Sequence, residues 1–200
     1  SNWSHRTPFL RTNSSKAMLT KSTNPRLVYR GNLHKAISIQ AVSNLNLIYL
    51  YWSNRLQDEK NNYFYFDYDL DNSLLGFFEK NNIVKLDIYN LLMLSTNSHH
   101  ALSVNNRKFY WNAIEHYFEP INYDANPSID ADNPTTTSSG QRFPGSKYII
   151  ESFDLLENKL KEIDLDNLYS QITLLVTDLT KPDLKNKIDK ILFNLEKIRI

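Results

Sequence analysis

Two aromatic runs separated by a short turn constrain the fold of this chain more than any other feature of its sequence. Residues 108–111 and 117–123 are rich in aromatic and β-branched side chains, which favour extended strands over helices. Only the residues from Asn112 to His116 separate them, so the second run must fold back against the first. The sequence therefore predicts an antiparallel β-hairpin with Asp124 at its end.

Helical spacing dominates the rest of the chain. From Leu33 to Leu56, apolar residues recur near the helical period with no Gly or Pro between them, which predicts one long helix. The C-terminal third has a similar pattern, in which Pro182 and Asp183 are typical of a helix start. Its predicted helices cover residues 148–163, 166–179 and 183–198. We therefore expect an α+β fold that is mostly helical, with short β-hairpins.

A short helix and a loop are predicted just before the hairpin. Asp87 is placed to cap a helix that runs to Leu94, because a carboxylate accepts hydrogen bonds from the free amides of a helix start. Residues 95–98 are Ser, Thr, Asn and Ser, whose side chains compete for backbone hydrogen bonds and so end a helix. His99 is therefore expected on a loop. After the hairpin, the prolines and glycines of residues 125–147 predict a long loop.

The length of the chain favours a single domain. Its 200 residues are enough for one sizeable core. Residues 1–26 are rich in Ser, Thr, Asn and Arg with few apolar positions, so we expect them to be extended or poorly ordered. Residues 27–200 are then one domain. Because the first residue is Ser and no signal segment opens the chain, we expect a piece of a longer protein.

The charge and hydropathy of the chain argue against nucleic-acid binding and against a membrane span. The chain carries 23 basic and 22 acidic residues, so it lacks the basic surface that nucleic acids require. Its longest apolar run, near residues 45–52, is too short for a bilayer, which needs about 20 apolar residues. We expect neither a nucleic-acid partner nor a membrane span in this chain. The absence of cysteine leaves the compartment open.

The segment from residue 96 to 130 carries the candidate site. Phosphoryl transfer needs a group that orients the acceptor, together with an amide and a carboxylate that bind a metal ion. The candidates for the metal are Asn106 and Asp124, those near the transferred group are His99 and His100, and those that neutralise phosphate charge are Arg107 and Lys108. His99, His100, Asn106 and Arg107 precede the predicted hairpin, Lys108 opens it, and Asp124 falls at its end.

Between residues 85 and 198 the chain resembles the CotH-type atypical kinases and, more loosely, the HipA-type kinases. Their catalytic loop reads Asn-x-Asp-x-x-x-x-Asn and is followed by a strand and a turn that leads from Pro to Asp. The matching positions here are Asn106 for the loop amide and Asp124 for the metal carboxylate, in the run from Pro120 to Asp124. The resemblance implies a kinase-like large lobe that uses ATP and Mg²⁺.

The catalytic Asp of that family is missing from this chain. Residues 97–100, which read Asn-Ser-His-His, stand in its place, so the base is a histidine or the fold lacks transferase activity. No Gly-rich phosphate loop with a following Lys precedes residue 60, so most of a small lobe is expected upstream. The resemblance further implies a protein or cell-envelope component as phosphate acceptor and an extracytoplasmic or envelope location.

A second enzyme class fits a different part of the chain. The aromatic, strand-like residues 63–66 lead into Asp69 and Asp71, which look like the first motif of haloacid-dehalogenase-type phosphatases. In that chemistry the first Asp attacks phosphorus and the second handles the proton of the leaving group. The later motifs of that family match residues 92–97 and 174–178, which would then lie on parallel strands. This alternative predicts a phosphohydrolase.

Two plainer interpretations stay open. Residues 96–130 can be a solvated loop followed by an ordinary hairpin, and the acidic residues from Asp67 to Asp71 can simply close a turn. Either pattern is compatible with a non-catalytic interaction domain.

Overall fold

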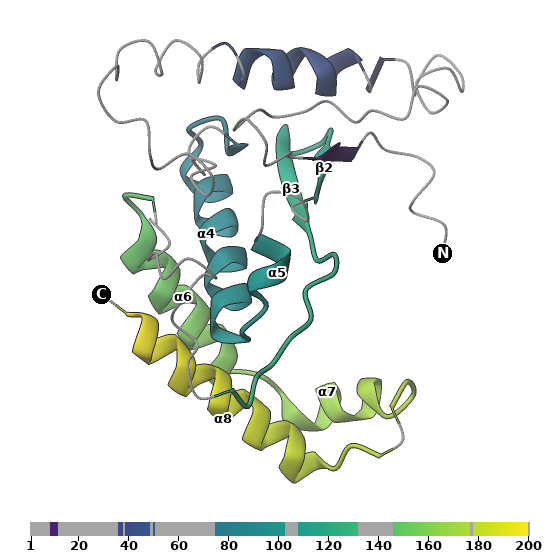
Figure 1. Ribbon diagram of the computed structural model, residues 1–200, viewed down its shortest axis with the longest axis vertical. Helices are drawn as coiled ribbons and strands as arrows, with labels where there is room; N and C mark the ends of the chain where they lie inside the picture. Colours follow the sequence, from purple (N-terminus) through teal and green to yellow (C-terminus); the bar gives the residue numbers. More distant parts are fainter. Residues whose placement is uncertain are drawn as a thin grey trace.

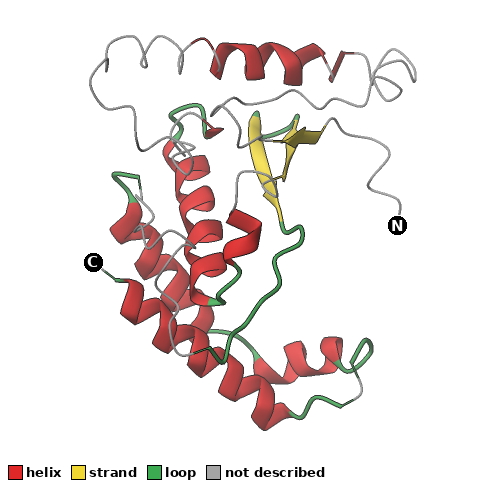
Figure 2. Cartoon of the chain, in the orientation of Figure 1, coloured by secondary structure: helices red, strands yellow, loops and turns green. Residues whose placement is uncertain are grey.

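The computed structural model describes residues 9–11, 36–37, 39–48, 50, 75–102, 108–131, 146–176 and 178–199. Within these residues the chain has a mostly helical α+β fold with one small antiparallel sheet (Figures 1 and 2). The elements are β1 Phe9–Arg11, α4 Lys80–Ser95, α5 His99–Leu102, β2 Lys108–Asn112, β3 Tyr117–Ile121, α6 Ile149–Lys161, α7 Leu165–Ile172 and α8 Lys181–Ile198. Residues 36–37, 39–48 and 50 are also helical. The predicted fold class is confirmed.

The sheet contains the predicted hairpin. Strand β2 pairs antiparallel with β3, with Trp111 opposite Phe118 and Lys108 opposite Ile121. On its other side β2 pairs with β1, which belongs to the N-terminal segment that we expected to be extended or poorly ordered. The strand order is therefore β1-β2-β3. Pro120, which has no amide hydrogen to donate, is tolerated because β3 is an edge strand.

The turn of the hairpin is held by its first residue. The Asn112 side-chain oxygen accepts hydrogen bonds from the backbone amides of Ile114 and Glu115, each at 3.0 Å. His116 closes the turn in the left-handed region, with φ of 55°. An Asn at the start of a turn favours this geometry, because its side chain replaces a backbone acceptor.

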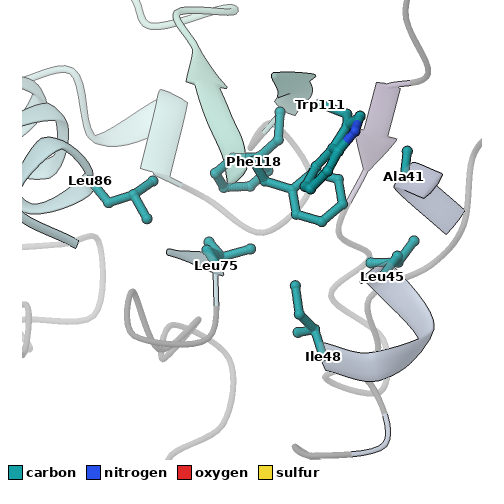
Figure 3. Close-up of a cluster of buried hydrophobic side chains, with 8 residues drawn as sticks. Ala41, Leu45, Ile48, Leu75, Leu86, Trp111 and Phe118 are labelled. Atoms are coloured by element: carbon teal, nitrogen blue, oxygen red, sulfur yellow. The ribbon is translucent and has the colours of Figure 1, made fainter. Parts of the chain in front are cut away.

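The hairpin buries its aromatic side chains against the N-terminal helical residues and α4. Trp111 and Phe118 are 1% and 2% exposed. Their ring centroids lie 5.0 Å apart. Figure 3 shows them between Leu86 of α4 and side chains of the N-terminal helical residues. This first core cluster consists of Ala41, Leu45, Ile48, Leu75, Leu86, Phe109, Trp111 and Phe118.

Helix α4 is the central element of the fold. It packs against α6 and α8 (Figure 1), and it is buried on most of its surface, as is typical of a helix surrounded by other elements. A second core cluster joins the three helices through Leu91 of α4, Phe153, Leu156 and Leu160 of α6, and Leu195 of α8.

The prediction that Asp87 caps a short helix is wrong. Helix α4 already begins at Lys80, and Asp87 is a fully buried residue in its middle. Its carboxylate accepts hydrogen bonds from the backbone amide and the hydroxyl of Ser146, just before α6. A buried carboxylate needs such partners, because burial without them costs several kcal/mol or more. Asp87 therefore fixes the start of α6 against α4.

The helical prediction for the C-terminal third is confirmed, with shifted ends. Helix α8 begins at Lys181, with Pro182 in its first turn. Thr180 and Asp183 form a capping box, in which each side chain bonds the backbone amide of the other residue. Helix α7 ends at Ile172, earlier than the predicted residue 179. Residues 173–175 turn instead, which leaves Leu174 and Leu175 largely exposed.

Several other predictions fall outside the described residues. These concern the strand at residues 63–66, Asp69 and Asp71, Asn106, Arg107, and the middle of the loop predicted at 125–147. For the part of the chain that is described, no helix combines the length and apolar character needed to cross a bilayer.

Candidate functional site

The described candidate residues meet where α5 lies beside the chain that leaves β3 (Figure 1). A third core cluster joins these segments to the end of α4. It consists of Met93, Leu94, Ala101, Leu102 and Ala125. Because Ala125 is anchored in this cluster, the residue before it, Asp124, is held beside α5.

The prediction that His99 lies on a loop is wrong. His99 opens α5, a helix of four residues. The predicted end of the preceding helix is confirmed at Ser95. There Asn97 adopts the left-handed conformation with φ of 55°, which lets the chain reverse and a new helix start at once. The short helix makes His99 and His100 adjacent on a fixed backbone.

The chain after β3 is fixed along its length by hydrogen bonds to the helices. Tyr89 of α4 donates its hydroxyl to the Ile121 carbonyl at 3.2 Å. The Ser128 amide bonds the Thr96 carbonyl at 3.0 Å. Asn194 of α8 donates to the Ile129 carbonyl at 3.2 Å. This segment therefore presents Asp124 from a backbone that is tied to α4 and α8.

Asp124 and His100 form the centre of the candidate site. The His100 Nδ1 atom lies 3.2 Å from the Asp124 Oδ2 atom. It also lies 2.9 Å from the Asp124 carbonyl oxygen. Both side chains are about half exposed, at 52% and 44%. Asp124 has φ of 50°, a backbone conformation that is uncommon outside Gly, Asn and Asp.

The contact with Asp124 fixes the protonation of His100. A carbonyl oxygen only accepts hydrogen bonds, so the His100 Nδ1 atom must carry the hydrogen. In the neutral imidazole, Nε2 is then the basic nitrogen. The carboxylate beside Nδ1 also orients the ring.

His99 is oriented by the neighbouring Asn97. The Asn97 amide nitrogen donates to the carbonyls of Ser128 and Ala131, at 3.0 and 3.4 Å. Its oxygen therefore faces the His99 Nε2 atom at 3.3 Å, and His99 must donate from Nε2. The His99 Nδ1 atom is buried and has no hydrogen-bond partner within the described residues. Burial lowers the pKa of His99 below its ordinary value of 6.5.

We expect the His99→Gln variant to lose less stability than the unmodified chain when the pH falls from about 7 to about 5. Because burial lowers the pKa of His99 in the folded state, the unfolded chain binds more protons at this residue around and below pH 6.5. The contribution of His99 to the free energy of unfolding therefore decreases as the pH falls. The variant keeps a polar side chain that does not titrate. Urea unfolding at a series of pH values measures the difference, and identical pH profiles would contradict it.

Lys108 is the remaining described candidate. It opens β2, and its ammonium lies over the ring of Tyr123, the residue before Asp124. The structure thus brings Lys108, His100 and Asp124 to the same end of the hairpin. It adds Tyr123, which had no predicted role, and Asn97, which the sequence had placed only within the runs 92–97 and 97–100. For Asn97 a signal existed, because an Asn directly after a helix favours the left-handed position that ends it.

The side chains around Asp124 can bind Mg²⁺ only if other ligands complete its coordination shell. Within the described residues no group of three or more His, Cys, Asp or Glu side chains could hold a metal ion. Asp124 contributes one carboxylate, which is half exposed. In nucleotide sites Mg²⁺ is bound by one or two carboxylates together with phosphate oxygens and water. Asp124 therefore suits a magnesium ion that arrives with a nucleotide.

No family model, curated protein sequence or solved structure matches this chain.

Proposed function

We propose that this chain is the large lobe of a kinase-like phosphotransferase that binds ATP and Mg²⁺ beside α5 and the end of the hairpin. The acceptor in this proposal is a protein or a component of the cell envelope. The observation that carries the proposal is the His100–Asp124 pair, with Nδ1 and Oδ2 at 3.2 Å. It places the Nδ1–H side of an imidazole beside the carboxylate that the family resemblance assigns to the metal.

Each residue of the candidate site has a separate role in the proposed reaction. Asp124 would hold the magnesium ion of the bound nucleotide, and that ion screens phosphate charge when it is present. Lys108 adds a positive charge at the same end of the hairpin. His100 is half exposed and oriented by Asp124, so its Nε2 atom is the candidate base for the acceptor hydroxyl. A histidine in this role replaces the absent family aspartate.

His99 has a different place in the proposal. Its Nδ1 atom is buried, so an acceptor cannot reach it without a movement of the chain. Its Nε2 atom is engaged with Asn97 at 3.3 Å. We therefore assign His99 a positioning role, in which it ties α5 to the chain after β3 through Asn97, and we assign the proton transfer to His100.

The phosphohydrolase alternative has less support. Its later motifs need strands at residues 92–97 and 174–178. In the structure Leu92 to Ser95 belong to α4, and residues 174–175 form a turn after α7. The described sheet is antiparallel throughout. Asp69 and Asp71 lie outside the described residues, so they are tested by substitution below.

The test compares two aspartates of the same segment. We expect Asp124→Asn to weaken Mg²⁺-dependent ATP binding by about tenfold or more, because the metal loses a charged ligand. Asn accepts the left-handed backbone of this position, so the fold is preserved. Isothermal titration with ATP, with and without Mg²⁺, measures the effect. The control is Asp130→Asn, which removes an exposed charge paired with Lys187.

Three outcomes separate the candidate functions. Loss of binding in Asp124→Asn, with normal binding in Asp130→Asn and Asp69→Ala, supports the kinase-like function. Loss in Asp69→Ala alone indicates the phosphohydrolase. If the unmodified chain binds no ATP in the presence of Mg²⁺, the proposal is wrong and the non-catalytic interaction domain is favoured.

A further inference from the structure

A cavity lies at the opposite end of the hairpin from Asp124. Its volume is about 440 Å³, within the range of small-molecule sites. It is bounded by the turn after β2, the residues before α4 and the N-terminal helical residues. The lining residues that matter below are Gln40, Ser43, Asn44, Phe77, Glu79 and His116. None of them belongs to the candidate phosphotransfer site.

A chain of hydrogen bonds fixes the protonation of His116 in this cavity. The Trp111 indole nitrogen only donates, and it lies 3.3 Å from the Gln40 Oε1 atom. The Gln40 Nε2 atom therefore faces the His116 Nδ1 atom, at 3.0 Å, and donates to it. His116 must then be the tautomer with its hydrogen on Nε2. The cavity thus contains an imidazole N–H donor whose orientation is set from the core.

Phe77 gives the cavity an aromatic wall. Its ring lies edge-on to Trp111 at 5.8 Å and stacks near Phe118 at 6.2 Å. The backbone of Phe77 and Phe78 is left-handed, with φ of 52° and 63°. This conformation costs of order 1 kcal/mol or more for a bulky residue, and such strain gathers at binding sites. Its contacts with Trp111 and Phe118 fix the Phe77 ring at the border of the cavity.

The polar groups of the cavity are mixed donors and acceptors. Ser43 offers a hydroxyl and Asn44 an amide, and both border the cavity. The Glu79 side chain is exposed, and within the described residues it forms no hydrogen bond or ion pair. It also does not cap α4. Glu115 is engaged with Lys85. The cavity therefore offers a carboxylate acceptor beside an N–H donor and an aromatic face.

We propose that this cavity binds a saccharide. A sugar ring has one apolar face that packs on an aromatic ring, and its rim of hydroxyls needs both donors and acceptors. The wall of Phe77, the N–H of His116 and the carboxylate of Glu79 supply these three elements. A phosphorylated ligand would meet the negative charge of Glu79, whereas the charge of Glu115 is paired with Lys85. A purely apolar ligand would leave these polar groups without partners.

The test is an NMR titration of the full chain with methyl β-D-glucopyranoside and with N-acetyl-D-glucosamine. We expect at least one of them to give saturable shifts at the Trp111 indole and the Gln40 side-chain amide. His116→Asn and Glu79→Ala should each weaken this binding by about tenfold, the effect of one lost polar contact of about 1.4 kcal/mol. Asn suits the left-handed position of His116, so the turn is preserved.

Controls make the result decisive. Glu162→Ala removes an exposed acidic residue at the end of α6, so it should bind the sugars as the unmodified chain does. The imidazole nitrogen shifts should place the His116 hydrogen on Nε2. The proposal is overturned if neither sugar shifts the cavity resonances, if the variants bind unchanged, or if the hydrogen is on Nδ1. The proposal is also overturned if 1,5-diaminopentane shifts these resonances and neither sugar does.

Discussion

Replacing Trp111 with alanine should lower the free energy of unfolding by about 3 to 5 kcal/mol. The side chain is 1% exposed and is the largest in the first core cluster. It touches the rings of Phe77 and Phe118, and its indole N–H bonds Gln40 at 3.3 Å. Alanine leaves a cavity between the hairpin, α4 and the N-terminal helical residues. Chemical denaturation followed by circular dichroism measures the loss.

The control for this variant lies in the same hairpin. Ile114 is 90% exposed at the turn, so Ile114→Ala should change stability by about 0.5 kcal/mol or less. Trp111→Phe should cost less than Trp111→Ala, since it keeps an aromatic ring in the cluster. Equal stability of the alanine variant and the unmodified chain would show that the hairpin does not pack on the helices as described.

Replacing Asn194 with alanine should destabilise the fold by about 2 to 4 kcal/mol. Asn194 is fully buried on α8, and its amide nitrogen donates to the Ser95 carbonyl at 2.9 Å and the Ile129 carbonyl at 3.2 Å. Alanine leaves two carbonyls in the interior without this donor. Those carbonyls end α4 and hold the chain after β3, so the loss should reach the candidate site.

An isosteric change separates the hydrogen bonds of Asn194 from its volume. Asn194→Asp places a carboxylate against the same two carbonyl oxygens, so at neutral pH it should destabilise at least as much as alanine. Asn186 is exposed on the same helix, and Asn186→Ala should change stability by about 0.5 kcal/mol or less. If Asn194→Ala behaved like Asn186→Ala, the two bonds would not join α8 to the rest of the domain.

The candidate site was partly predictable from the sequence because its residues are close along the chain. Asp124 follows the hairpin directly, and the hairpin was predictable from its two aromatic runs. The pairing of His100 with Asp124 was not predictable. It depends on α5, a four-residue helix that has too few positions to show a period. It depends also on Ala125, whose burial fixes the direction in which Asp124 leaves the strand.

Asp87 illustrates a misleading local signal. A carboxylate near the start of an apolar run resembles a helix cap, because caps and buried polar residues use the same side chains. The hydrogen-bond partner of the carboxylate distinguishes a helix cap from a buried polar residue. Here the partner is Ser146, which is distant in sequence and approaches only because α6 packs on α4.

The amino-acid sequence alone determined the mostly helical α+β class, the antiparallel hairpin, the end of α4 at Ser95 and the C-terminal helices with the Pro182 start. These features depend on neighbours within a few residues, where periodicity, capping and turn chemistry act. Only the tertiary structure decided that Asp87 is buried, that His100 faces Asp124 and that Gln40 links Trp111 to His116. Those contacts join residues that belong to different elements of the fold, so their geometry follows from packing.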